Sequence, residues 1–203
     1  MLQISTVTAD TLELLKRLQS IPELAETRLV GGTALALHLG HRLSIDLDLF
    51  GKLDQEKITE TLKSESFDSF IVHSETEVIK HYIINQIKVD IVKYDRYQWL
   101  EKSVNEDKIT IAGLKDIAAM KIAAITNRGT KKDFIDIYFL LNHFSLKEIM
   151  DLYLEKYPDA NVFMAIISLA YFDDAEKDDM PKMFIPTQWE DVKRRIIEEV
   201  KQI

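Results

Sequence analysis

Two acidic residues, Asp46 and Asp48, stand two positions apart in the apolar run Ile45–Leu49, shortly after the glycine pair Gly31–Gly32. Side chains two apart in a β-strand point to the same face. Both carboxylates would therefore project together, while the apolar residues of the run point into the core. Because magnesium prefers carboxylate, phosphate and water oxygens, the pattern predicts a site for a magnesium–triphosphate complex.

A third acid, Asp90, lies in the β-type run Ile87–Lys93, where Lys88 and Asp90 alternate with Val89 and Ile91. If this strand lies beside the first acidic strand, three carboxylates can converge on two magnesium ions. Two metals about 3.5–4 Å apart stabilise the attacking and leaving oxygens of an in-line phosphoryl displacement. The alternative is that all three acids are solvent-facing residues on half-buried strands.

The segment Gly31–Gly32–Thr33 precedes a short apolar helical run. Glycines there expose backbone N–H groups near a helix N-terminus, where phosphate oxygens bind favourably, and Thr33 would add a hydroxyl donor. By itself the glycine pair could serve backbone geometry alone. Its position just before Asp46 and Asp48 favours phosphate binding.

Lys121 interrupts the otherwise apolar helical segment 117–125. A buried ammonium is costly without a partner, so the side chain either reaches water along the core or faces a cleft and neutralises a triphosphate. Further on, Asp133 and Asp136 lie one helical turn apart. Lys132 and Asp136 could form a surface ion pair, and Asp133 could serve near a helix N-terminus.

Periodicity predicts an α+β fold: a mixed sheet with flanking helices, followed by a C-terminal helical bundle. The division expected is 1–105 for the sheet-containing core with the acids and 106–203 for a helical domain that completes the cleft. A hairpin turn is expected at Asn85–Gln86. The predicted strands are 28–30, 44–50, 70–73, 78–84 and 87–94, and the predicted helices are 10–21, 33–39, 55–63, 114–126, 132–143, 146–156, 161–171 and 189–203.

Composition narrows the class of protein. The 203 residues contain no cysteine, which excludes disulfides and thiolate metal sites, and carry a net charge of −8. That charge argues against broad, nonspecific nucleic-acid binding, although a local basic groove remains compatible with it. There is no basic-then-apolar leader and no apolar run near about 18 residues, so we expect a cytoplasmic protein without a membrane span.

Four blocks of the chain resemble the AbiEii/AbiGii family of nucleotidyltransferase-like toxins, within the polymerase-β-like nucleotidyltransferase superfamily. They are Gly31–Thr33 leading through Arg42 and Ser44 to Asp46 and Asp48; Lys88–Val89–Asp90; Asp116–Lys121; and Arg128–Asp136. The resemblance implies metal ligation by Asp46, Asp48 and Asp90, with Lys121 on nucleotide phosphate. It implies nucleotide binding by Gly31, Gly32, Thr33, Arg42, Ser44, Lys88, Lys132, Asp133 and Asp136. The motif lysine could be Lys131 or Lys132.

The activity implied is magnesium-dependent transfer of a nucleoside monophosphate from an NTP to an acceptor hydroxyl. An RNA 3′ end such as that of tRNA is the acceptor implied by the resemblance, and a cognate antitoxin is the implied partner, in a toxin–antitoxin or phage-defence system. Two alternatives stay open. One is nucleotidyl transfer to a protein or small molecule, and the other is a nucleotide-binding module without catalysis.

Overall fold

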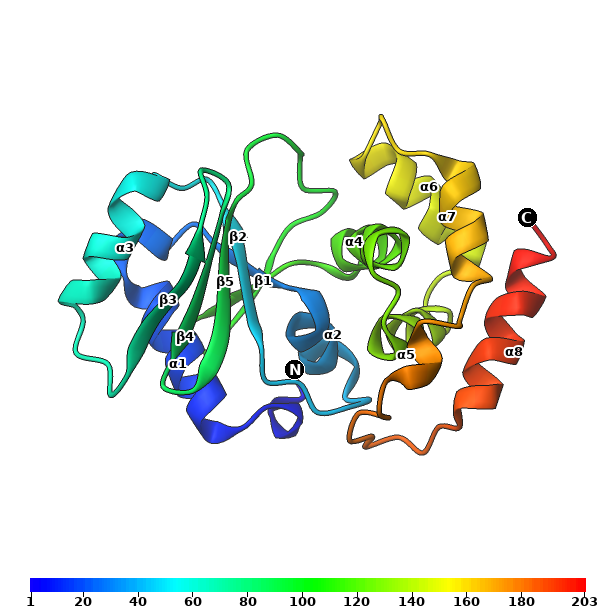
Figure 1. Cartoon of the computed structure of the whole chain (residues 1–203), viewed down its shortest axis with the longest axis horizontal. Helices are drawn as coiled ribbons and strands as arrows, with labels where there is room; N and C mark the ends of the chain where they lie inside the picture. The colour runs from blue at the N-terminus through cyan, green and yellow to red at the C-terminus, as the bar shows by residue number, and fades with distance from the viewer.

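A seven-stranded mixed sheet forms one half of the computed structural model, which describes residues 1–203, and helices form the other half (Figure 1). The strand order is β3-β4-β5-β2-β1-β7-β6. The β2–β5 and β1–β7 pairs are parallel, and the other neighbours are antiparallel. The strands are β1 (Arg28–Val30), β2 (Leu47–Gly51), β3 (Phe70–Glu75), β4 (Ile79–Ile84), β5 (Ile87–Lys93), β6 (Val104–Glu106) and β7 (Ile109–Ile111).

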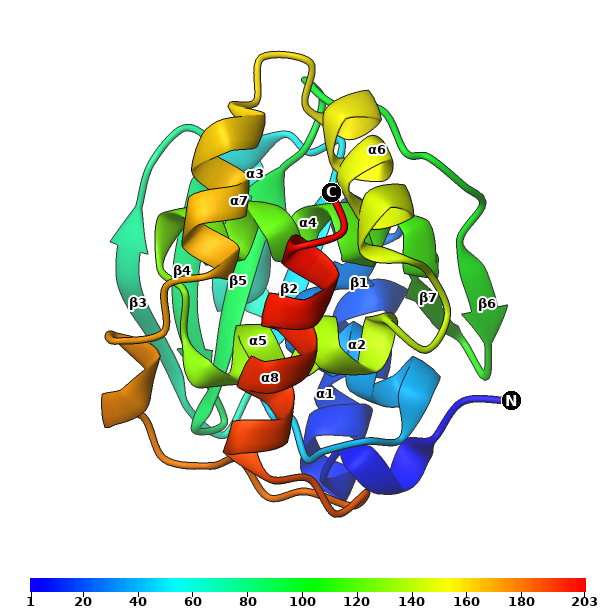
Figure 2. The ribbon, with the colours of Figure 1, turned by 90° about the vertical axis from the view of Figure 1, so that its right-hand side faces the viewer.

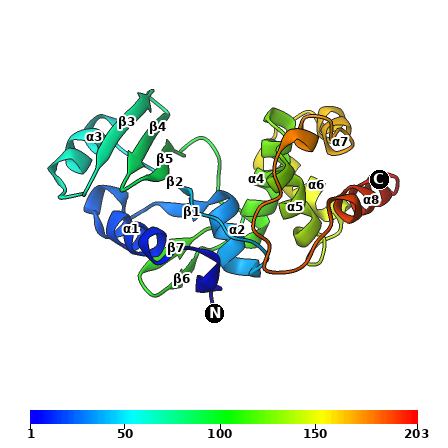
Figure 3. The ribbon, with the colours of Figure 1, turned by 60° about the horizontal axis from the view of Figure 1, so that its bottom comes forward.

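Helices cover both faces of the sheet. Helices α1 (Ala9–Ser20) and α3 (Gln55–Ser64) lie on one face, and α2 (Gly31–Leu39) and α4 (Leu114–Asn127) lie toward the other (Figures 1 and 3). Alternation along the central strands explains this layering, because Leu47 and Leu49 are fully buried while Asp48 between them is only half-buried. The two faces of β2 therefore carry different chemistry, one apolar and one acidic.

Helix α4 joins the two halves of the molecule, because it packs against α2 on the sheet side and against α5, α6 and α7 on the other. The helical half consists of α4, α5 (Lys131–Leu140), α6 (Leu146–Lys156), α7 (Val162–Leu169) and α8 (Trp189–Val200) (Figure 2). One hydrophobic cluster runs through both halves, from Leu2 to Ile196. The expected α+β architecture is confirmed. No helix has the length and apolar character needed to cross a membrane.

The β6–β7 hairpin is absent from the sequence-based prediction. Its turn residues Asp107 and Lys108 have φ values of 50° and 65°, the same as those of Asn85 and Gln86 at the β4–β5 turn. Positive φ at both central positions is the type I′ geometry of two-residue hairpins, so the predicted turn at Asn85–Gln86 is confirmed. Asp-Lys lacks the glycine that usually marks such a turn, and two three-residue strands carry too little periodicity to detect.

The predicted division at residue 105 falls inside β6, and the following strand β7 pairs with β1 at the register Leu29–Ile111. The sheet therefore includes residues on both sides of that position. Separate domains over 1–105 and 106–203 stay a prediction.

Strand β2 starts at Leu47, three residues later than expected. The backbone N–H groups of Leu43 and Ser44 bond to the carbonyl oxygens of Lys182 and Thr6, outside the sheet, and are therefore unavailable to a ladder. Ile45 is 50% exposed, so the prediction that it points into the core was wrong. Asp46 consequently lies in a loop, while Asp48 alone of the two acids lies in the strand.

Candidate active site

The carboxylates of Asp48 and Asp90 lie on adjacent parallel strands in direct register. Asp48 also lies against the first residue of α2, because a Cβ atom added to Gly31 would overlap its Oδ2 atom. Gly31 has φ = 71°, a conformation that glycine adopts without steric cost. The structure therefore places Asp48, in register with Asp90, against the glycine turn. The convergence of Asp46, Asp48 and Asp90 on one metal site stays a prediction.

The Asp48 carboxylate has no cation in contact with it. Burial, the neighbouring Asp90 carboxylate and Asp46 raise the pKa of Asp48 to about 6, against the opposing effect of Lys121 and Lys88. Its side chain has no hydrogen-bond or ion-pair partner within the chain, so the cations Lys121 and Lys88 act on its charge only through longer-range electrostatics. Desolvation and a like charge both favour the protonated acid, and a bound cation would reverse both effects.

Asp90 has two close partners. His81 Nδ1 lies 2.7 Å from Asp90 Oδ1, and Lys88 Nζ lies 3.1 Å from Oδ2. Sequence reasoning singled out Lys88 but not His81. The contact between His81 and Asp90 could have been predicted from the hairpin, because a two-residue turn at Asn85–Gln86 pairs position 81 with position 90.

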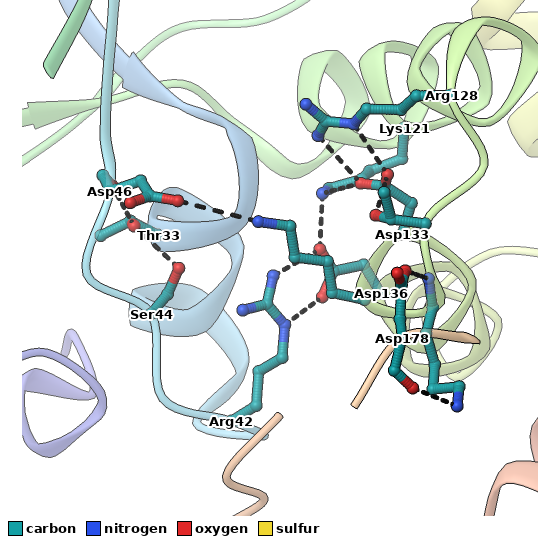
Figure 4. A network of polar contacts seen from close by, with 12 residues as sticks. Thr33, Arg42, Ser44, Asp46, Lys121, Arg128, Asp133, Asp136 and Asp178 are labelled. Atoms are coloured by element: carbon teal, nitrogen blue, oxygen red, sulfur yellow. Dashed lines mark hydrogen bonds and ion pairs between the residues drawn. The ribbon is translucent and has the colours of Figure 1, made fainter. Parts of the chain in front are cut away.

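The third acid lies apart from this pair. Asp46 is on the loop before β2, and its Oδ2 is 3.7 Å from Lys132 Nζ, which comes from the start of α5 (Figure 4). The side chains as placed include no group of three or more His, Asp or Glu residues arranged to hold a metal ion. The structure thus brings Asp48 and Asp90 into register on adjacent strands, and Asp46 lies on a different element.

Thr33 and Ser44 secure that loop. The Thr33 hydroxyl lies within hydrogen-bond distance of the Asp46 carbonyl oxygen and 2.9 Å from Ser44 Oγ (Figure 4). Thr33 is buried, so its hydroxyl is committed to the chain. Its direct contact with phosphate stays a prediction.

A buried ion network fills the junction between α2, α4 and α5 (Figure 4). The Asp136 carboxylate accepts hydrogen bonds from Nε and Nη2 of Arg42 at 2.7 and 2.8 Å. It also lies 2.8 Å from His41 Nε2 and 2.6 Å from Lys121 Nζ. Although burial opposes ionisation, the cations Arg42 and Lys121 hold the pKa of Asp136 well below its usual range. This carboxylate joins the segment after α2 to the helical half.

Asp133 anchors the cations next to Asp48. It accepts hydrogen bonds from Lys121 Nζ at 3.0 Å, Arg128 Nε at 3.0 Å and the Thr130 hydroxyl at 2.6 Å. The Lys121 ammonium is therefore neither free in a cleft nor extended to water, the two alternatives that its sequence context allowed. It is almost fully buried between two aspartates, yet the residue still lines the cavity beside Asp48.

Three residues proposed for nucleotide binding, Arg42, Asp133 and Asp136, are committed to this network and do not line the cavity. Their direct contact with a nucleotide stays a prediction. The two candidate motif lysines differ in position. Lys131 is buried, and its backbone N–H donates to Asp178 Oδ2 at 2.9 Å, whereas Lys132 is 45% exposed and reaches toward Asp46.

A cavity of about 340 Å³ opens between the sheet and α4. Its wall includes Gly31, Asp48, Lys121 and Arg128 at the polar end and Phe50, Ile117, Met120 and Tyr157 at the apolar end. A second cavity of about 580 Å³ shares Phe50, Ala123, Asn127 and Tyr157 with the first and adds Tyr94, Tyr97 and Arg96. The two cavities are therefore neighbours, with Asp48 in the wall of the first and Tyr94 and Tyr97 in the wall of the second.

The donor set consists of carboxylate oxygens, which suit hard divalent cations such as magnesium. Asp48 and Asp90 offer oxygen ligands on adjacent strands, and no cysteine is present. Magnesium is commonly held by one or two carboxylates plus substrate phosphates and water, so two facing carboxylates are sufficient protein ligands.

Comparison with known proteins decides the family. A family model described as "Nucleotidyl transferase AbiEii toxin, Type IV TA system" matches residues 13–202. The chain belongs to the AbiEii family. It is accordingly a nucleotidyltransferase, and the resemblance seen in the sequence is confirmed. A relative from Aquifex aeolicus, the uncharacterized protein aq_aa25, is 33% identical over 206 residues, and 94% of each chain is covered.

Solved structures show the same fold. A putative nucleotidyltransferase from H. pylori matches with a TM-score of 0.62 at 18% identity, over 96% of this chain and 95% of that one. MenT4, a nucleotidyltransferase toxin from Mycobacterium tuberculosis, matches with a TM-score of 0.62 at 15% identity, over 96% and 82%. At these identities the likeness establishes the AbiEii chain's fold and leaves its substrate to be argued from the site.

Proposed function

We propose that this chain transfers a nucleoside monophosphate from an NTP to an acceptor hydroxyl and releases pyrophosphate, in a reaction that depends on magnesium. The observation that carries the proposal is the position of Asp48, opposite Asp90 and against the start of α2, at the polar end of a cavity of about 340 Å³. Magnesium held there would stabilise the charge that develops on the phosphoryl oxygens.

The triphosphate would lie at the N-terminus of α2, where Gly31 and Gly32 present backbone N–H groups at the positive end of the helix. Asp46 is the third metal ligand in this proposal. Lys132, whose ammonium lies 3.7 Å from Asp46, is the exposed cation placed to offset phosphate charge. Lys121 acts from its buried position, as a fixed positive charge that lowers the pKa of Asp48.

Asp90 would accept the proton of the attacking hydroxyl, since it is in register with Asp48 on the adjacent strand. The nucleoside would lie along the apolar part of the cavity, on Phe50 and between Met120 and Tyr157. Most of the rate enhancement would then come from positioning and from charges arranged before the reaction.

An RNA 3′ end such as that of tRNA is the proposed acceptor, with growth arrest as the consequence, a cognate antitoxin as partner and the cytoplasm as location. Membership of a toxin family described as type IV supports this part. The outer cavity offers a stacking surface in Tyr97, and its wall carries two cations, Lys93 and Arg96, together with two acids, Glu77 and Asp95. The net charge of −8 favours the second candidate, a protein or small-molecule acceptor.

The test is to incubate the protein with magnesium, each α-labelled NTP in turn and total tRNA, and to follow label in RNA and release of pyrophosphate. We expect one NTP to label RNA with wild-type protein and not with Asp48→Asn. Label in protein or in a small molecule would identify the second candidate. Binding of NTP by calorimetry with no turnover on any acceptor would contradict the enzymatic proposal.

A further inference from the structure

We infer that His81 is a positioning residue for Asp90, and that its ring N–H holds this carboxylate in the orientation required at the magnesium site. The inference rests on the proposed function and adds to it a residue outside the sequence motifs. It concerns orientation of the ligand, because His81 lies behind Asp90 as seen from Asp48.

Three adjacent strands place the residues in one lateral row. Asp48 on β2 is in register with Asp90 on β5, and Asp90 is in register with His81 on β4. The β4–β5 hairpin sets the second pairing through its two-residue turn at Asn85–Gln86. Since directly opposed side chains of antiparallel strands are neighbours, the hairpin register delivers the imidazole to the far side of Asp90.

The hydrogen bond has a defined direction. An ionised carboxylate only accepts, so Nδ1 of His81 must carry the hydrogen that bridges the 2.7 Å to Asp90 Oδ1. This bond occupies one lone pair on one oxygen. The other oxygen lies toward Lys88, and neither oxygen has a further hydrogen-bond or ion-pair partner within the chain.

Lys88 and His81 differ in how firmly they hold Asp90. The Lys88 side chain is 54% exposed and its ammonium can rotate on a flexible stem, so the 3.1 Å contact with Oδ2 can be exchanged for a phosphate oxygen. The His81 side chain is 29% exposed and has only two rotatable bonds. The histidine is therefore the partner that can fix the carboxylate plane while substrate exchanges at the lysine.

Partners of this kind around metal ligands affect metal affinity by roughly 10- to 100-fold when removed. His81→Leu removes the donor and keeps a side chain of similar bulk. His81→Asn keeps a donor, because the amide nitrogen is attached to Cγ as Nδ1 is. His143→Leu is the matched control, since His143 is an exposed histidine on the connection between α5 and α6.

The experiment measures Mn²⁺ affinity by electron paramagnetic resonance in the presence of a non-hydrolysable NTP, with thermal melting as a check of folding. We expect His81→Leu to weaken Mn²⁺ binding about 10-fold or more, at an unchanged melting temperature. The Mn²⁺ affinity of His81→Asn should lie within about threefold of that of wild type, because this variant keeps a hydrogen-bond donor to Asp90. His143→Leu should bind as wild type does.

Two results would overturn the inference in distinguishable ways. If Asp48→Asn abolishes Mn²⁺ binding but His81→Leu binds like wild type, His81 has no positioning role and the proposed function stands. If Asp48→Asn leaves Mn²⁺ binding unchanged, the metal site itself is elsewhere, and both the proposed function and the role of His81 fail.

Discussion

The ammonium of Lys121 lies 2.6 Å from Asp136 Oδ2, inside the helical half of the molecule and almost fully shielded from water. The lysine expected to meet a triphosphate is thus held by the protein before any nucleotide arrives. Its charge still acts on Asp48, whose pKa it lowers. The buried network around Lys121 therefore affects both the stability of the fold and the charge state of Asp48. Substitutions at Asp136 and at Asp48 test these two effects separately.

Asp136→Ala should destabilise the protein strongly. The substitution leaves Arg42, Lys121 and His41 buried without their shared acceptor, and breaking such a buried pair typically costs about 3–5 kcal/mol. Asp151→Ala is the control, because Asp151 pairs with Lys147 on an exposed helix face and should cost at most about 0.5 kcal/mol. Urea denaturation measures both. Equal losses for the two variants would contradict the stabilising role of the network.

Asp48→Asn should change the pH dependence of stability. The folded pKa of Asp48, about 6, lies above its ordinary value of 3.8, so the folded protein binds more protons between these values. Its contribution to stability therefore falls as pH rises from about 4 to about 6. We expect the melting temperature of Asp48→Asn to rise relative to that of wild type as the pH increases from about 4 to about 6.

Magnesium should reduce the difference in melting temperature between Asp48→Asn and wild type. A cation between Asp48 and Asp90 offsets the repulsion that burial and Asp46 intensify, so wild type should gain in melting temperature at pH 7 and the variant should not. Calorimetry with and without the ion, at matched ionic strength, distinguishes this from general screening. A rise of equal size in both proteins would show that Asp48 does not bind the ion.

Gly31→Ala and Gly40→Ala form a matched pair, because both glycines have φ near 70°. Each substitution should cost about 1–2 kcal/mol for the left-handed backbone. At Gly40 the new Cβ meets only the flexible side chain of Gln3, whereas at Gly31 it overlaps the Asp48 carboxylate. Nucleotidyl transfer should therefore fall at least about 10-fold in Gly31→Ala alone, by loss of a metal ligand's position. Similar activity in both variants would contradict this reading of the turn.

Lys132→Ala and Lys131→Ala should separate the two candidate lysines. The ammonium of Lys132 is exposed and faces Asp46, so its loss should raise the KM for NTP and leave the melting temperature unchanged. Lys131 is buried and bonds to the segment containing Asp178. Its loss should lower stability by about 1–3 kcal/mol, as for other broken buried polar contacts. The reverse assignment would follow if Lys131→Ala raised KM without destabilising the fold.

Local patterns in the sequence were sufficient for most of the architecture. The strand β1 and the helix α6 have the predicted bounds, and the turn at Asn85–Gln86 has the predicted geometry, because each depends on neighbouring residues. The acids at positions 48 and 90 and the glycine turn were singled out for the same reason. Their spacing along strands and at a helix start has a direct physical meaning that needs no knowledge of distant contacts.

The tertiary structure alone decided which charges pair. Arg42 and Asp136 are 94 residues apart, and the sequence offered Lys132 as the partner of Asp136. Burial selected among them, because an unpaired charge is costly in the core and the packing of α2 against α4 and α5 brings these side chains together. The same packing placed Lys121 beside Asp133. Backbone hydrogen bonds from Leu43 and Ser44 to Lys182 and Thr6 kept Asp46 off the strand.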